Sequence, residues 1–308
     1  QSSICRGAST ILIASSNISI TSYVWSNYFV GNNITVTPST TTTYSVTGTS
    51  NEGCTGTTEV TITVHPLPNI SATANPEEIC FGDSSDLIVI SDIPGSTFSW
   101  SNGLGTNPNV TVSPTATTTY SVTGTTPEGC TGTAEVTVTV HPLPTVTASA
   151  SSYSVCLGDS SILTASSNIS GTTFEWSHNL GSDPTMTVTP NYTTIYSVTG
   201  TTQFGCSSST SITIIVKDIP NTSIATSNDT ICSGQSTILT ASGADFYSWS
   251  HYLGTDSSQT VSPISTTTYT VTGSFANGCS STGAIQIIVN PIPNIVINAS
   301  NNAICFGD

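Results

Sequence analysis

Residues 117–144, TTTYSVTGTTPEGCTGTAEVTVTVHPLP, decide the fold of this chain of 308 residues. Apolar and hydroxyl side chains alternate on both sides of the turn PEGC, first around Tyr120 and then from Val136 to Val140. A period of two residues predicts two antiparallel strands, each with one buried face and one solvent-facing face. The stretch closes on a proline pair, and proline ends a strand because it cannot donate to a sheet ladder.

The same signals recur along the chain, which makes it a repeat protein with a unit of about 76 residues. Each unit has a Cys near its start, a Trp 17 to 20 residues later, a Tyr, and a second Cys ten residues after that Tyr. A proline motif ends each unit: HPLP at residues 65–68 and 141–144, DIP ending at Pro220, and NPIP ending at Pro293. The first Cys series is Cys5, Cys80, Cys156, Cys232 and Cys305, and the second is Cys54, Cys130, Cys206 and Cys279.

In the second unit, short alternating segments follow one another at residues 87–90, 98–100, 110–112, 120–123 and 136–140, separated by turn sequences. No helical stripe interrupts them, so we expect an all-β chain of immunoglobulin-like antiparallel β-sandwiches. The recurring aromatic residues are the expected core: Trp25, Trp100, Trp176, Trp249, Tyr44, Tyr120, Tyr196 and Tyr269.

We therefore predict four tandem sandwiches and the start of a fifth. The limits are residues 1–67 for repeat 1, which is truncated at its N-terminal side, then 68–143, 144–219 and 220–292 for repeats 2 to 4, and 293–308 for the first strand of repeat 5. The last residues, NAICFGD, match EEICFGD before Ser84. We interpret the chain as a window of a longer array, or as a protomer whose ends a neighbour completes.

Two disulfide arrangements are open. Two Cys per unit favour self-contained pairs, Cys5–Cys54, Cys80–Cys130, Cys156–Cys206 and Cys232–Cys279, and a 50-residue loop closed by Cys80–Cys130 would contribute about 4 kcal/mol to a small domain. However, the first Cys of each unit precedes the second strand of its sandwich, and the second Cys lies in the hairpin between the last two strands. In a standard sandwich these two places are at opposite ends. The alternative pairs therefore join neighbouring repeats: Cys5–Cys130, Cys80–Cys206 and Cys156–Cys279.

The composition excludes several classes of function. The formal net charge is −15, and Arg6 and Lys217 are the only basic residues, so nucleic acid and anionic membranes are poor partners. With few Lys, Arg and His residues, and no Ser-His-Asp set or phosphate loop, we expect no enzyme. Nine Cys in a chain without a long apolar run indicate a secreted protein in an oxidising compartment, with no membrane insertion.

The motifs C-x-G-x-S-x-x-L (CRGASTIL from Cys5, CLGDSSIL from Cys156, CSGQSTIL from Cys232), V-x-P-x-x-T-T-x-Y-S-V-T-G-T and G-C resemble one known group. They are similar to the immunoglobulin-like repeats of large secreted and cell-surface proteins of Bacteroidota-type bacteria, which often carry type IX secretion signals. The resemblance covers all four complete units. It implies an extracellular spacer, adhesin stalk or fibre, and it offers no catalytic residues.

Two sets of residues are weak metal candidates. Glu77, Glu78, Asp83 and Asp86 are weak candidate calcium ligands, but their spacing matches no known loop, so a solvated acidic end is favoured over a calcium site. His178 and His251 each follow a Trp by two residues, where the first two units have Asn27 and Asn102, which favours a turn position over a metal ligand. We expect no cofactor.

Covalent sugars are the strongest candidate modification. Nine Asn-x-Ser/Thr sequons are present, at Asn17, Asn33, Asn69, Asn109, Asn168, Asn191, Asn221, Asn228 and Asn298. The Thr-rich strand faces, as at Thr61, Thr63, Thr137 and Thr139, offer hydroxyl groups, and Asp229-Thr230-Ile231 resembles a bacterial O-glycosylation motif. The competing explanation is that Thr is frequent on these faces because it favours β-strands.

Our leading hypothesis is a structural, non-catalytic segment of an extracellular bacterial fibre or surface stalk, whose partners are neighbouring repeats or further copies. An adhesin that binds carbohydrate or a cell-surface partner is the first alternative, and an accessory spacer of a secreted polysaccharide-degrading enzyme is the second. All units have nearly the same length, without one enlarged loop, which favours spacing over recognition.

Overall fold

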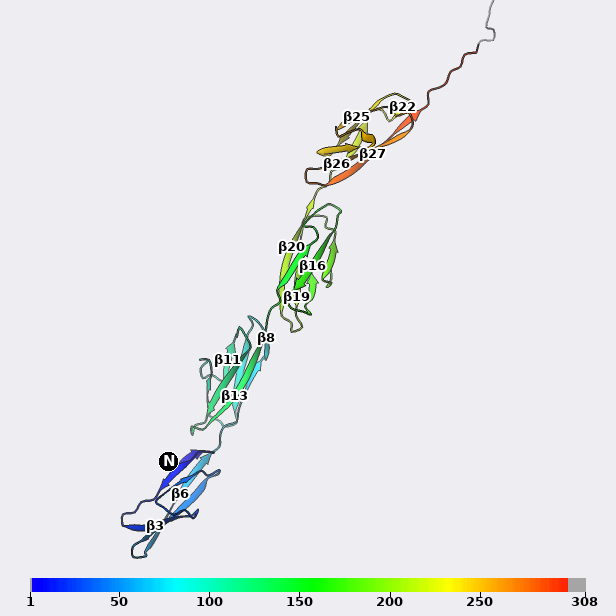
Figure 1. The fold of residues 1–308 in the computed structure, drawn as a ribbon. Coiled ribbons are helices and arrows are strands. Elements are labelled where there is room, and N and C mark those ends of the chain that lie inside the picture. The colour runs from blue at the N-terminus through cyan, green and yellow to red at the C-terminus, as the bar shows by residue number, and fades with distance from the viewer. Residues whose placement is uncertain (1, 299–308) are drawn as a thin grey trace, which may run out of the picture. The chain divides into compact units, whose positions relative to one another are not determined.

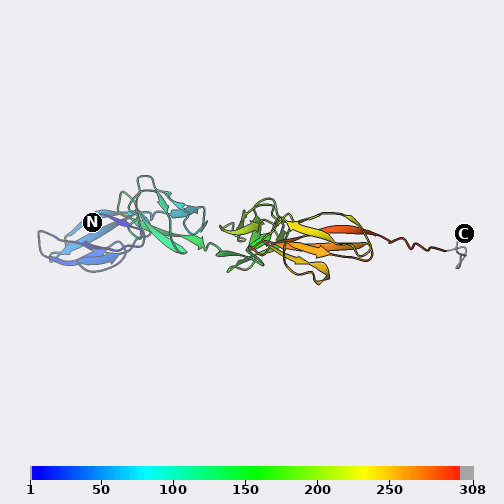
Figure 2. The same cartoon turned by 90° about the horizontal axis from the view of Figure 1, so that it is seen from above.

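A computed structural model describes residues 2–298 and shows an all-β chain, a tandem array of immunoglobulin-like sandwiches (Figures 1 and 2). The described residues hold 27 strands and one 3₁₀ turn of three residues. Their contacts define two units: residues up to Leu143 with Gln203–Cys206, and Pro144–Thr202 with the chain from Ser207 onward. Cys305 and most of the predicted fifth repeat lie outside the described residues. Residues 293–298, predicted as part of its first strand, form no strand.

Repeat 2 shows the complete sandwich, with seven strands in two sheets. One sheet has the order β11-β9-β7 and the other β10-β12-β13-β8. All neighbours are antiparallel except β8, which runs parallel to the end of β13. The strands are β7 (Ile70–Asn75), β8 (Glu78–Cys80), β9 (Ser85–Ser91), β10 (Thr97–Trp100), β11 (Asn109–Val112), β12 (Thr118–Thr125) and β13 (Thr131–His141).

Repeats 3 and 4 repeat this topology, with sheets β14-β16-β18 and β15-β20-β19-β17, then β21-β23-β25 and β22-β27-β26-β24. Repeat 3 has β14 (Val146–Ala150), β15 (Ser154–Cys156), β16 (Ser161–Ser167), β17 (Thr173–Trp176), β18 (Thr185–Val188), β19 (Thr194–Thr201) and β20 (Ser207–Lys217). Repeat 4 has β21 (Ser223–Thr226), β22 (Thr230–Cys232), β23 (Thr237–Ser242), β24 (Phe246–Trp249), η1 (Ser250–Tyr252), β25 (Ser258–Val261), β26 (Thr267–Ser274) and β27 (Ser280–Asn290).

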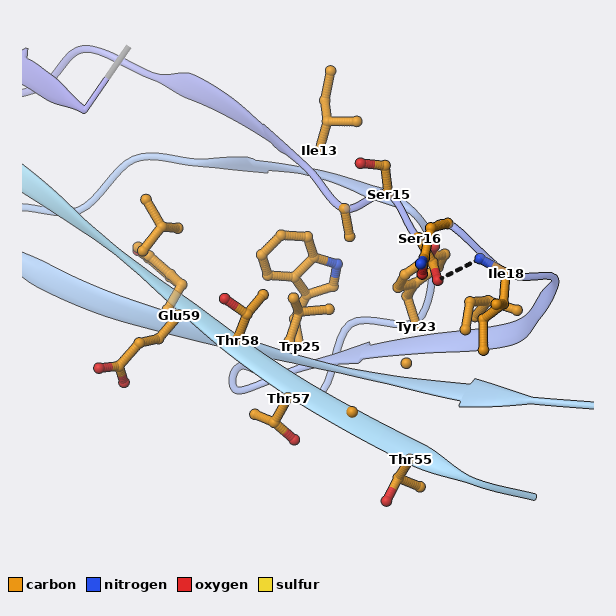
Figure 3. A pocket seen from close by; sticks show the side chains of 18 of the residues that line it. Ile13, Ser15, Ser16, Ile18, Tyr23, Trp25, Thr55, Thr57, Thr58 and Glu59 are labelled. Carbon is orange, nitrogen blue, oxygen red and sulfur yellow. Dashed lines mark hydrogen bonds between the residues drawn. The ribbon is translucent and has the colours of Figure 1, made fainter. Parts of the chain in front are cut away.

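Repeat 1 has one strand fewer in the described chain. Its strands are β1 (Ser3–Cys5), β2 (Thr10–Ile13), β3 (Ile20–Trp25), β4 (Asn33–Val36), β5 (Thr42–Ser50) and β6 (Thr55–His65). The larger sheet, β1-β6-β5-β3, is complete, but the second sheet holds only β2 and β4. Beside β2 the structure has a groove, and Figure 3 shows Trp25 at its base between Ile13 on one wall and Thr57 on the other.

Each sandwich has its own core, because alternate residues of both sheets face inward. The four Trp residues are buried, as are Tyr120, Tyr196 and Tyr269, whereas Tyr44 of repeat 1 is only partly buried. A buried indole needs an acceptor for its N–H. In every repeat a backbone carbonyl of the following loop supplies it, for example Asn107 O for Trp100 Nε1 at 3.0 Å.

The T-T-x-Y motif caps the sheet. The hydroxyl oxygen of Thr117 accepts a hydrogen bond from the Val140 backbone N–H at 3.1 Å, and Thr41, Thr193 and Thr266 do the same in the other repeats. The next residue, Thr118, donates its hydroxyl proton to the Ala116 carbonyl at 2.7 Å. This Thr pair thus satisfies backbone groups where the hairpin ladder ends.

Gly in the S-V-T-G-T motif makes room for the first strand of the sandwich. A Cβ atom at Gly124 would collide with the Ile70 side chain of β7. Gly200 stands in the same relation to Val146, and Gly273 to Thr222 just before β21. The motif therefore has Gly at this position because the two sheets approach each other too closely for a side chain.

Replacing Thr117 by Val should destabilise repeat 2 by about 1 kcal/mol, because the Val140 N–H loses its acceptor. Urea unfolding measures this loss. The matched control is Thr119→Val, which removes a hydroxyl that bonds only the exposed Thr137 hydroxyl and leaves every backbone group paired. Equal losses for the two variants would contradict a capping role.

Burial raises the pKa of the Tyr120, Tyr196 and Tyr269 phenols, and hydrogen bonds with Thr118 and Thr194 oppose the rise at the first two. A raised pKa keeps the folded phenol neutral while the unfolded chain already releases its proton. The contribution of these phenols to the free energy of unfolding is fully present below pH ~10. It falls as the pH rises further, by at most about 1.4 kcal/mol per phenol and pH unit.

We therefore expect the triple variant Tyr120→Phe, Tyr196→Phe, Tyr269→Phe to lose less stability than the original chain between pH 9 and 11, measured by urea unfolding. The control changes three exposed residues, Tyr28, Tyr153 and Tyr252, to Phe. Its pH dependence should match that of the original chain. An equally weak pH dependence of stability in both variants would refute the assignment of the effect to the three buried tyrosines.

Candidate functional site

The described residues hold three disulfides, and each joins two successive repeats. They are Cys5–Cys130, Cys80–Cys206 and Cys156–Cys279, with Cα–Cα distances of 5.6, 5.5 and 5.7 Å. In each pair the first Cys ends the short strand that runs parallel to the last strand of its repeat. The second Cys lies in the turn between the last two strands of the next repeat, which is called the F–G turn below. Among the described residues, Cys54 and Cys232 are unpaired and exposed.

The favoured pairing inside each repeat, Cys5–Cys54, Cys80–Cys130, Cys156–Cys206 and Cys232–Cys279, is therefore wrong. In repeat 2, Cys80 is paired in register with His141, the last residue of β13, whereas Cys130 precedes the first residue of that strand. Eleven strand residues span roughly 33 Å, and a disulfide requires Cα atoms within ~7 Å. Strand β13 itself keeps the two sulfur atoms apart.

This arrangement also contradicts the prediction that each small domain is stabilised by a disulfide of its own. No described disulfide closes a loop within one repeat, so the cores and sheet ladders hold each sandwich together. The bonds instead provide a second covalent connection beside the proline linker. Their sulfur atoms are protected, because Cys130, Cys206 and Cys279 are each 1% exposed.

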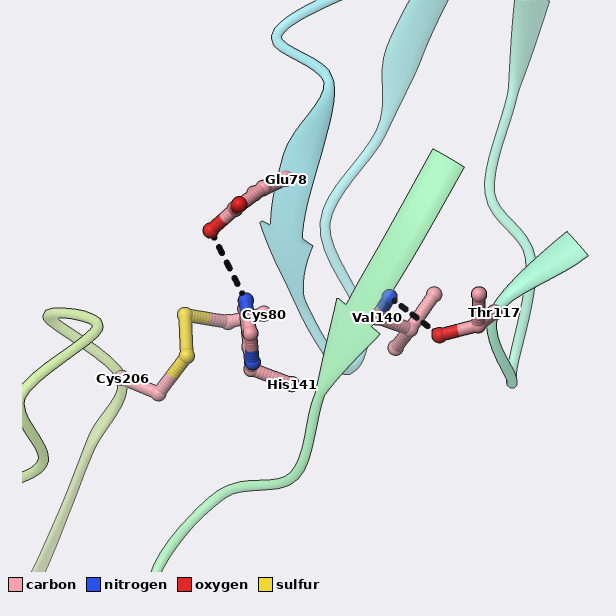
Figure 4. A network of polar contacts seen from close by, with 6 residues as sticks. All are labelled: Glu78, Cys80, Thr117, Val140, His141 and Cys206. Carbon is pink, nitrogen blue, oxygen red and sulfur yellow. Dashed lines mark hydrogen bonds and ion pairs between the residues drawn. A yellow bond between two sulfur atoms is a disulfide. The ribbon is translucent and has the colours of Figure 1, made fainter. Parts of the chain in front are cut away.

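The surroundings of Cys80–Cys206 lie within the first unit (Figure 4). The His141 ring, at the end of β13, stacks on Phe204 with 3.7 Å between ring centroids. Its Nε2 lies 3.0 Å from Glu78 Oε2 on β8. The stack and the polar contact hold the turn that carries Cys206 against the two strands that end at Cys80 and His141.

The Cys156–Cys279 bond, in the second unit, has different polar neighbours. Lys217 occupies the position of His141, and its Nζ donates to the Asn277 carbonyl at 3.1 Å. The Asn277 side chain donates in turn to the Asp218 carbonyl at 3.1 Å. Junctions with the same disulfide therefore use different side chains, which explains why the HPLP histidine is replaceable in the sequence.

The metal candidates do not come together. Glu78 contacts His141, Asp86 accepts a hydrogen bond from Thr111 at 2.6 Å, and no described group of three or more His, Cys, Asp or Glu residues could hold a metal ion. The calcium candidates Glu77, Glu78, Asp83 and Asp86 are all exposed on the surface of repeat 2. His178 and His251 adopt φ of 60° and 59° in tight turns, as does Asn102 at 56°, a conformation that Asn tolerates well.

The candidate glycosylation positions are accessible. All nine sequon Asn residues and Thr230 are exposed. On the strand faces, however, Thr hydroxyls already bond each other across strands, Thr43 with Thr61 and Thr119 with Thr137, each at 2.8 Å. Those Thr residues thus stabilise their sheets directly.

A cut between repeats 2 and 3 tests the connectivity. We expect a chain with a protease site inserted between Pro142 and Leu143 to stay joined on a non-reducing gel after cleavage, because Cys80–Cys206 is the one disulfide of the described residues that crosses this point. Dithiothreitol should release the fragments. In the Cys206→Ser variant they should separate without reductant. If the fragments of the chain with its cysteines intact separate without reductant, the bond between repeats is contradicted and pairing within repeats is supported.

No family model and no curated protein matches this sequence. Among solved structures, one similar chain is the ICAM-5 D1–D4 ectodomain fragment, at 11% identity and a TM-score of 0.44 over 94% of this chain and 97% of that one. A second is a Ca²⁺-stabilised adhesin that helps an Antarctic bacterium bind ice, at 15% identity and a TM-score of 0.35 over 94% and 96%. A third is Sidekick-1 immunoglobulin domains 1–5, at 14% identity and a TM-score of 0.29 over 94% and 78%.

Proposed function

We propose that this chain is a structural, non-catalytic segment of an extracellular bacterial stalk or fibre. One observation carries the proposal: every described disulfide connects successive repeats, and none closes a repeat on itself. A bond of this kind adds little to the folding of one sandwich. It limits instead how far two sandwiches can bend or twist about the proline linker between them, which is the property that a spacer needs.

The surface supports the same function. The chain has two basic residues, and its exposed strand faces carry mainly Thr and Ser. Such a surface is suited to remaining hydrated at the cell exterior, and exposed sequons offer places for neutral sugars. Disulfides persist in oxidising compartments outside the cytoplasm. The resemblance to repeats of Bacteroidota-type surface proteins supports the bacterial setting of the proposal. No described helix has the length and apolar character needed to cross a bilayer.

Removing one disulfide should loosen its junction without unfolding either sandwich. In the variant Cys156→Ser, Cys279→Ser, we expect a broader pair-distance distribution by small-angle X-ray scattering of the monomeric fraction, with an unchanged far-ultraviolet circular dichroism spectrum. The matched control is Cys54→Ser, Cys232→Ser, which removes two unpaired thiols. This control should reproduce the original distribution. Identical scattering from all three proteins would overturn the spacer function.

A further inference from the structure

The F–G turn of repeat 4 contains a chemically reactive dipeptide beside the Cys156–Cys279 bond. Asn277 is followed by Gly278, and both residues are exposed. In an Asn-Gly pair the glycine backbone nitrogen can attack the asparagine Cγ, because glycine has no side chain to crowd the five-membered ring that forms. The product is a cyclic imide, and ammonia leaves. No described atom lies within 4 Å of a Cβ placed at Gly278, so the surroundings of this nitrogen are open.

The single lysine of the sequence lies against this turn. Lys217 Nζ donates to the Asn277 carbonyl oxygen at 3.1 Å, and Asn277 Nδ2 donates to the Asp218 carbonyl at 3.1 Å. At the preceding junction the equivalent positions hold His141 and Phe204, whose rings stack. Contact between these two positions is thus a recurring feature of the array. Between repeats 3 and 4 it brings an amine to an Asn-Gly pair.

Two hydrogen bonds favour formation of the imide. Loss of the Gly278 amide proton leaves a negative charge shared with the Asn277 carbonyl oxygen, and the Lys217 ammonium donates to that oxygen. Attack on Cγ then moves charge onto Oδ1, which accepts from the Cys279 backbone N–H at 2.9 Å. The Gly278 N–H itself donates to the Phe275 carbonyl at 3.0 Å. This bond must open before the nitrogen attacks, so we expect a slow reaction.

We propose that Lys217 captures the imide at position 277 and forms an amide that joins repeats 3 and 4. The contact geometry supports this step, because the Asn277 carbonyl that already accepts from Lys217 becomes one of the two imide carbonyls. The amine in its neutral form attacks an imide carbonyl carbon, and the bond from that carbon to the Gly278 nitrogen breaks. This nitrogen takes up the proton that the amine releases.

The atoms balance without an oxidant. Over both steps, one lysine amine and one asparagine side-chain amide become one new amide and one ammonia. Attack at Cγ restores the ordinary backbone between residues 277 and 278, whereas attack at the α-carbonyl leaves an isoaspartyl linkage. The two products have the same mass, and in both the chain stays continuous.

This cross-link goes beyond the spacer function and does not depend on it. It would give the junction of repeats 3 and 4 a covalent connection that reductants cannot open, in addition to Cys156–Cys279. The scattering test concerns the disulfide, so its failure would leave the amide standing. A junction without the amide would still have its disulfide.

Trypsin gives a direct readout, because Arg6 and Lys217 are the only basic residues and therefore its only cleavage sites. The native 308-residue chain is incubated for a long period in mildly alkaline buffer, and samples are then reduced, alkylated, denatured and digested. An amide on Lys217 blocks the cut that releases residues 218–308. We expect an uncut fragment, residues 7–308, to accumulate with time, and mass spectrometry should show the loss of one ammonia between Lys217 and Asn277.

The chain contains its own control. Asn102-Gly103 is the other Asn-Gly pair of the sequence and is also exposed, but no second lysine exists to capture its imide. Water should open that imide to aspartate and isoaspartate. The same incubation in guanidinium chloride with a reductant should give these products at positions 102 and 277 alike, and trypsin should then cut after Lys217 in every chain.

Two variants separate the roles of the residues. Lys217→Arg keeps a cationic donor and a trypsin site but removes the nucleophile, so position 277 should convert to aspartate and isoaspartate and cleavage should be complete. Asn277→Gln keeps the side-chain amide but requires a six-membered ring, so the uncut fragment should disappear. Both variants should keep the original circular dichroism spectrum, because Asn277 is exposed and Lys217 is only partly buried.

Three results would overturn the proposal. The first is complete cleavage after Lys217 in native samples in which Asn102 has already converted. The second is an uncut fragment that persists in Asn277→Gln, since the amide would then form without the imide. The third is an uncut fragment that accumulates equally in guanidinium chloride, because the folded contact would then have no part in the reaction.

Discussion

The parallel pairing of one three-residue strand with the end of the last strand is the constraint on which the other features depend. In repeat 2, β8 lies in register with residues 139–141 of β13, so Cys80 is held beside the exit of the chain into the proline linker. From there its sulfur points to the next repeat and not to its own F–G turn. Register alone thus converts a pair of cysteines per repeat into a series of bonds between repeats.

Much of the fold could be predicted from the sequence, because two-residue alternation and periodic Trp and Tyr residues report directly on strands and core. The short strand β8 gave no such signal. Three residues, Glu78 to Cys80, are too few to show a period, and a parallel partner some 60 residues away in the chain leaves no local pattern. Counting two Cys per unit therefore favoured the wrong pairs, although the displacement of both cysteines from mid-strand already indicated the right ones.

The candidate site was harder to predict for a related reason. His141, Phe204 and Glu78 converge from three segments, and their equivalents at the next junction are Lys217 and Asn277, so no fixed motif marks the place. Gly124 and Thr117 recur in every repeat, but the reason lies in contacts with Ile70 and Val140 that only the assembled sheets show. Repetition in the sequence indicated that these positions matter, and the packing of the two sheets explains why.

The folding of each repeat is coupled to its connection with the repeat before it. A sandwich is complete only when the strand after the preceding linker lies on its Gly positions, and it is covalently tied to the preceding repeat by the Cys that ends the short parallel strand of that repeat. Each sandwich therefore receives a strand and a bond from the N-terminal side. The folding of a sandwich and its connection to the preceding repeat therefore draw on one set of contacts, which recurs along the array.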